Sequence, residues 1–318
     1  MMYLVDIDLY LGCALFGGML AFLAAGYGGA LMSLCSQILA RRSKQVFLDK
    51  FGQQMTRMAL WSLLVSFLLA GGCLVLASYR FGFAVEGLLA ADPNLMAWPP
   101  GLLVLAAVLL WLSLVSWRPL KRRHSAHLLF GLLATAALFL FIPVAVNVAG
   151  HQFRGSTEEA GAAMMWWSAL WPISGQHLGP LVGQLFCLGP GCGGAWALMY
   201  LLKRRNRDDF GRDYYRHMSP LGARWALAFT LQVPFAAWMA RDILKTPWQE
   251  LMHQDMSWAF GVFLVLAALA AILWSKVLKS THPMREKAAM IGSALCVWIA
   301  VSANVLGYVR LFGLVQSW

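Results

Sequence analysis

The chain has 318 residues, of which 60% are hydrophobic and only 12% are charged, and its mean hydropathy is +0.64. A soluble domain carries roughly 25% charged residues, so this chain could not cover a water-exposed surface with polar groups. The composition therefore excludes an ordinary soluble domain, a disordered chain, a collagen-like chain and a disulfide scaffold. It predicts a protein whose main solvent is lipid.

Eight stretches without charged residues follow one another along the chain. They cover residues 9–40, 58–79, 93–117, 124–153, 160–202, 225–240, 256–275 and 288–309. A membrane-spanning helix needs about 20 apolar residues, and these stretches are continuous apolar runs rather than the alternating segments of a β-barrel. We predict an all-α, polytopic integral membrane protein with eight transmembrane helices. The helices would form two four-helix sets, over residues 1–150 and 151–318, and the second set would include an interfacial segment.

The fifth and sixth stretches are unusual in length. The fifth, 160–202, is long for one crossing and tight for two. Its tryptophans favour the headgroup zone, and Pro172–Gln176 would break a helix. We therefore expect an interfacial segment at 162–172 and a crossing at about 178–202. The sixth stretch, 225–240, is short. We expect its span to begin earlier, through Leu221 and Gly222, so that it reaches spanning length.

The distribution of charge predicts the orientation. Twenty of the 25 basic residues lie in four connections, at 41–57, 118–123, 203–224 and 276–287. Nine of the 14 acidic residues lie at the opposite ends of the predicted spans. Because basic residues are enriched in cytoplasmic loops, these four connections are expected in the cytoplasm and both termini outside.

The predicted spans carry little ionisable chemistry. Their centres hold no Asp, Glu, Lys or Arg, the groups that proton pumps and ion-coupled transporters use within the membrane. The polar side chains that remain there are Asn147, Gln184, Gln232, Ser302 and Asn304. Six cysteines show no metal-binding spacing and are interpreted as small apolar residues. Two glycine clusters, 26–29 and 189–194, predict close packing of helices.

Two histidines and one acid are candidates for an outer-side site. A haem between helices needs axial His or Met ligands, and on this topology His151 and His177 could reach a haem near the outer surface. The alternative for each is a hydrogen-bonded interfacial histidine. Glu86 is the acid nearest the membrane. It is either a solvated loop acid or a buried carboxylate beside an outer-side site.

Six short elements occur in an order that resembles subunit I of the cytochrome bd-type quinol oxidases, across almost the whole chain. They are Ser43–Gly52, Val85–Leu89, Asn147, Pro172–His177, Leu198–Lys203 and Gly307–Arg310. The resemblance implies a subunit of a respiratory electron-transfer complex in a bacterial-type inner (cytoplasmic) membrane, with other subunits as partners. It also implies a quinone or haem site on the outer side, with Glu86, Asn147 and Arg310 among its residues. His151 and His177 would join them, with His177 as the metal ligand.

The chain departs from that family at its haem ligands. The family's histidine in the first span falls at or near Phe16. Its histidine in the fifth span falls near Pro180, one turn from His177, and its span-seven methionine corresponds to Phe263. The outer loop after the sixth span, which handles quinol in the family, is shortened to about 241–255. We therefore expect a non-catalytic subunit with a scaffold, partner-docking or quinone-site role. Its cofactor would be a quinone, a single haem b or none, and no nucleic acid partner is expected.

Two other functions stay open. One is a haem b-bearing, quinol-oxidising cytochrome subunit with His177 as ligand. The other is a small-molecule transporter or channel, whose polar path would use the broken fifth span and the amides of Asn147 and Asn304.

Overall fold

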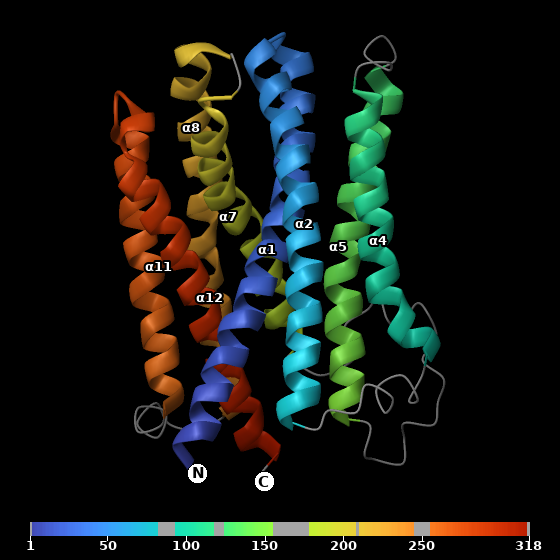
Figure 1. Cartoon of the computed structure of the whole chain (residues 1–318), viewed down its shortest axis with the longest axis vertical. Helices are drawn as coiled ribbons and strands as arrows, with labels where there is room; N and C mark the ends of the chain where they lie inside the picture. Colours follow the sequence, from blue (N-terminus) through green and yellow to red (C-terminus); the bar gives the residue numbers. More distant parts are fainter. Residues whose placement is uncertain are drawn as a thin grey trace.

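The computed structural model describes residues 2–81, 93–117, 124–154, 178–207, 210–244 and 255–316, and long helices lie alongside one another in it (Figure 1). All regular structure in these ranges is helical, which confirms the predicted class. The elements are α1 (Met2–Ser43), α2 (Val46–Phe81), α4 (Pro93–Ser116), α5 (His124–Arg154), α7 (Leu178–Arg204), α8 (Gly211–Ala226), η3 (Leu227–Leu231), α9 (Gln232–Leu244), α11 (Asp255–Lys279), η4 (Pro283–Arg285) and α12 (Lys287–Gln316).

Within the described residues, seven helices are long and apolar enough to cross a membrane. They are α1, α2, α4, α5, α7, α11 and α12. A helix satisfies its backbone hydrogen bonds internally, which is what a chain surrounded by hydrocarbon requires. The chain is therefore of the multi-pass membrane type. Helix α7 matches the crossing expected at 178–202, whereas the interfacial segment expected at 162–172 lies outside the described residues.

The crossing expected at 225–240 has a different form. Helices α8, η3 and α9 follow one another without a break, but each is too short to span a bilayer by itself. Pro234 has no amide hydrogen to donate to the carbonyl four residues earlier, which favours the tighter 3₁₀ turns of η3 just before it. The count of eight continuous spanning helices is therefore not confirmed.

The two ends of the bundle differ in charge. Both chain termini lie at the same end, which we call the terminal end (Figure 1). Helices α1, α7 and α11 finish at the opposite end, which we call the basic end. Their last turns carry Arg41, Arg42, Lys203, Arg204, Lys276 and Lys279. Cations at helix C-termini are stabilised by the helix dipole, so these basic residues are locally favourable. Basic residues gathered at one end of a bundle are also typical of the cytoplasmic face of a membrane protein.

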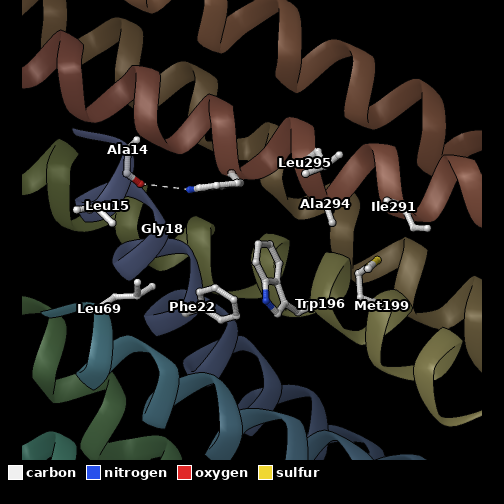
Figure 2. A pocket seen from close by; sticks show the side chains of 11 residues that line it. Ala14, Leu15, Gly18, Phe22, Leu69, Trp196, Met199, Ile291, Ala294 and Leu295 are labelled. Atoms are coloured by element: carbon white, nitrogen blue, oxygen red, sulfur yellow. Dashed lines mark hydrogen bonds between the residues drawn. The ribbon is translucent and has the colours of Figure 1, made fainter. Parts of the chain in front are cut away.

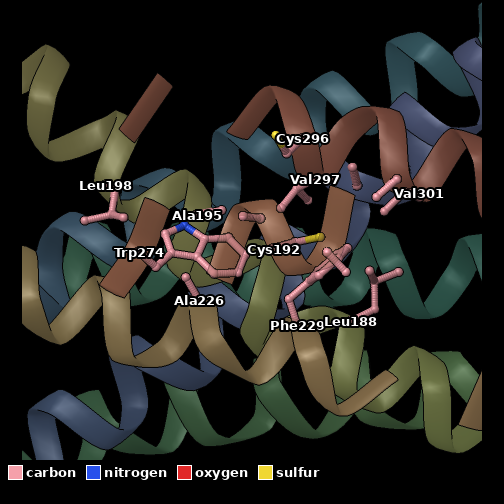
Figure 3. Packing of buried hydrophobic residues seen from close by; sticks show 14 of the residues in the cluster. Leu188, Cys192, Ala195, Leu198, Ala226, Phe229, Trp274, Cys296, Val297 and Val301 are labelled. Atoms are coloured by element: carbon pink, nitrogen blue, oxygen red, sulfur yellow. The ribbon is translucent and has the colours of Figure 1, made fainter. Parts of the chain in front are cut away.

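The main hydrophobic core joins α1, α7, α8, η3, α9, α11 and α12. At its centre the indole of Trp274 lies among Ala195, Cys192 and Ala226 (Figure 3). Phe229 packs against this indole with ring centroids 6.2 Å apart. A second core joins α1, α2, α4 and α5, and a third, rich in methionine and tyrosine, lies toward the basic end. Helix α1 contributes to all three.

Candidate functional site

Helices α1 and α7 touch backbone to backbone through glycines. A Cβ atom placed on Gly193 would lie 2.7 Å from the carbonyl carbon of Gly28, and one placed on Gly28 would collide with the carbonyl oxygen of Gly189. Real Cβ atoms do not approach other atoms this closely, so these positions accept glycine alone without a shift of the helices. The predicted close packing of the two glycine clusters is confirmed.

The opposite face of α7 packs as closely on the next helices. A Cβ atom on Gly191 would lie 2.6 Å from the Cα of Phe229, and one on Gly194 would lie 2.6 Å from the Cα of Ala226. Helix α7 is thus held between α1 on one side and α8 and η3 on the other. The helix is continuous through Pro190. This packing sets the position of every polar side chain that α7 carries.

Near the terminal end, α7 and α12 bring three polar side chains together. The Tyr308 hydroxyl donates a hydrogen bond to Oε1 of Gln184, and the amide of Asn304, one turn before Tyr308, interacts with the same hydroxyl. The Phe260 ring of α11 packs edge-on against Tyr308, with ring centroids 5.7 Å apart. We call Gln184, Asn304 and Tyr308 the polar cluster.

Two members of the polar cluster are buried, and the third, Tyr308, is half-buried. Gln184 is 2% exposed and Asn304 is 8% exposed. Oδ1 of Asn304 has no hydrogen-bond partner within the described ranges. A buried acceptor without a donor costs about 1–3 kcal/mol, so this oxygen favours any ligand that brings a donor. The arrangement can accept a hydrogen bond from a hydroxyl group at the terminal end of the bundle.

The other predicted site residues are placed as follows. Asn147 is fully buried in α5, four residues before His151. His151 lies in α5 and Arg310 in α12, but their side chains are outside the described part of the structure. Glu86 and His177 lie outside the described residues altogether.

The residues that the resemblance would place at or near haem ligands have side chains that cannot bind iron. Phe16 is 42% exposed on α1, and Phe263 is 1% exposed in the main core, with its ring centroid 6.3 Å from that of Phe229. Pro180 lies in the first turn of α7. These residues do not fit the haem pair that the resemblance would imply.

The histidines with described side chains lie at the basic end. Nδ1 of His127 is 3.0 Å from the Ser116 hydroxyl, and Nδ1 of His217 is 2.8 Å from the carbonyl oxygen of Asp213. His282 is exposed just before η4. Across the described residues, no group of three or more His, Cys, Asp and Glu side chains is arranged to hold a metal ion.

A buried polar network toward the basic end was not predicted from the sequence. The Ser33 hydroxyl lies 2.6 Å from the Thr56 hydroxyl and donates to the Gly52 carbonyl at 2.8 Å, which joins α1 to α2. Tyr214 of α8 donates to Oε1 of Gln54 on α2 at 2.5 Å. These bonds connect two consecutive helices, α1 and α2, and tie α8 to α2 across 160 residues of sequence, so their role is to fix the packing of the three helices.

No protein family, curated protein or solved structure matches the chain.

Proposed function

We propose that this chain is a non-catalytic membrane subunit of a respiratory electron-transfer complex and that its polar cluster binds the headgroup of a quinol. Two features support the proposal. The chain's elements occur in the order of the quinol-oxidase subunit that it resembles. In addition, Tyr308 of the polar cluster belongs to one of those elements, Gly307–Arg310.

The observation that carries the proposal is the buried Oδ1 of Asn304. A quinol bears hydroxyl groups that can donate to this oxygen, whereas an oxidised quinone bears carbonyl groups that can only accept. The Tyr308 hydroxyl proton is engaged by Gln184, and the buried atom of the polar cluster left without a partner in the described residues is an acceptor, Oδ1 of Asn304. The reduced form is therefore the form that the polar cluster favours.

The proposal includes eight membrane crossings in a bacterial-type inner membrane. Both termini lie at one end of the bundle, and a chain that starts and finishes on the same side makes an even number of crossings. The continuous helical path from α8 through η3 to α9, residues 211–244, would supply the eighth. The basic end would face the cytoplasm and both termini the outside, in accord with the enrichment of basic residues in cytoplasmic loops.

The test is the binding of a short-chain quinol and of its oxidised form to the purified protein in nanodiscs. The wild type should bind the quinol more tightly than the quinone. Asn304→Leu should weaken quinol binding about tenfold, the equivalent of one hydrogen bond of about 1.4 kcal/mol, and remove the preference. Ser302→Ala is the matched control, because the Ser302 hydroxyl donates to the Trp298 carbonyl of its own helix at 2.9 Å. Equal binding of both forms by the wild type would refute the proposal.

A further inference from the structure

A separate apolar groove lies between α1, α2, α7 and α12. Its volume is about 380 Å³, within the range of about 300–1,000 Å³ typical of small-ligand pockets. In Figure 2 the groove is elongated, with Ala14 and Leu15 at one end and Met199 and Ile291 at the other. All of its lining residues lie within helices that are long and apolar enough to span a membrane.

The walls of the groove are made by aromatic and aliphatic side chains. Phe22 and Trp196 pack edge-on, with ring centroids 5.1 Å apart, and form one wall. The opposite wall is formed by residues of α12, including Ala294 and Leu295 (Figure 2). Nε1 of Trp298 donates to the Ala14 carbonyl at 3.3 Å. This bond ties α12 to α1 at the Ala14 end of the groove. The groove therefore offers apolar contact and no side-chain charge.

Two of the four groove helices, α7 and α12, carry a lysine on the groove-lining face toward the basic end. On α7, Trp196 and Met199 are followed by Lys203, at helical spacings of three and four residues. On α12, Lys287 is followed by Ile291, again four residues away. At 1.5 Å per residue, each lysine lies about 6 Å beyond the nearest groove residue of its helix.

The two lysines belong to adjacent parts of the basic end. Nη1 of Arg205, just after α7, donates to the Met284 carbonyl of η4 at 3.3 Å, which brings the end of α7 to the start of α12. Lys203 and Lys287 are both exposed. Glu286, the acid next to Lys287, forms its ion pair with Lys276 at 3.1 Å. The region above the groove therefore has an excess of positive charge.

We propose that this groove is a binding site for an anionic phospholipid of the leaflet at the basic end. One acyl chain would lie along the groove between Trp196 and Leu295, and the phosphate would contact Lys203 and Lys287. A hydrocarbon chain matches the uncharged walls, and the cationic rim one turn away matches the headgroup. The site is independent of the polar cluster and of any redox role.

The test reconstitutes the protein into vesicles with equal amounts of phosphatidylglycerol and phosphatidylcholine, extracts it in mild detergent and counts retained lipids by native mass spectrometry. The wild type should retain phosphatidylglycerol preferentially. Lys203→Gln with Lys287→Gln should lower that preference about tenfold. The matched control is Lys44→Gln with Lys279→Gln, which removes two lysines of the same end that do not adjoin the groove, and it should retain the preference.

Two further measurements test the acyl chain separately from the charge. Ala294→Phe fills the groove without a change in charge and should also abolish preferential retention. Phosphatidylglycerol with a photoreactive diazirine on its acyl chain should label the peptides around Met199 and Ile291. The proposal is overturned if both lipids are retained equally by the wild type, if the control pair loses the preference as fully as the test pair, or if the label falls on other helices.

Discussion

Gly193 of α7 lies directly against Gly28 of α1, so closely that a Cβ atom on Gly193 would be 2.7 Å from the Gly28 carbonyl carbon. This contact matters beyond the two residues. Helix α7 carries Gln184 of the polar cluster and two residues of the groove wall, Trp196 and Met199. A change in the separation of α1 and α7 would therefore displace both sites.

Gly193→Ala should destabilise the protein by about 1–3 kcal/mol, because the new methyl group meets backbone atoms that cannot rotate away. The measurement is the free energy of unfolding from titration with SDS in mixed micelles. Gly72→Ala is the matched control, since its Cβ atom would meet nothing within 4 Å of the described structure. The control should be neutral or stabilising by about 0.5–1 kcal/mol, as alanine favours a helix over glycine. Similar losses in both variants would contradict the packing described.

Tyr214→Phe should lower the free energy of unfolding by about 1–3 kcal/mol, because it leaves Oε1 of the buried Gln54 without its 2.5 Å hydrogen bond. Thermal denaturation in detergent measures the effect. Tyr10→Phe removes a hydroxyl from a residue that is 53% exposed and should change stability little. If the two substitutions have the same effect, the Tyr214–Gln54 bond does not stabilise the interface between α8 and α2.

The number of crossings can be tested on the two sides of residues 211–244. Asn206→Cys and Gln249→Cys, introduced singly into a chain without native cysteines, should react with a membrane-impermeant maleimide from opposite sides of the membrane. The reason is that the helical path from α8 to α9 would carry the chain across. Labelling of both positions from the same side would show that this path does not cross.

Much of the architecture could be predicted because apolar stretches and helix-breaking residues are local signals. The start of α7 at Leu178 follows from the Pro172–Gln176 run, and the two glycine clusters predict close helix packing without saying that α1 and α7 are the helices that meet. The form of the sixth crossing, at 225–240, could not be predicted in the same way. Pro234 interrupts the hydrogen-bond pattern of the helix and favours 3₁₀ geometry before it, and a count of charged residues carries no information on this.

The polar cluster could not be assembled from the sequence. The sequence places Gln184 and Asn304 within spans as separate polar groups, but their meeting through Tyr308 depends on how α7 and α12 are rotated against each other. The pair Ser33 and Thr56 depends in the same way on the packing of α1 on α2. A single sequence specifies the faces of each helix, whereas these contacts arise from the register between helices.

The central claim, that this chain is a subunit without the haem pair of the family it resembles, is tested most directly by a pyridine haemochrome assay on the purified polypeptide. We predict fewer than two haems per polypeptide, because Phe16 and Phe263, at or near the positions where the resemblance places iron ligands, cannot bind iron. Two or more haems per polypeptide would contradict it.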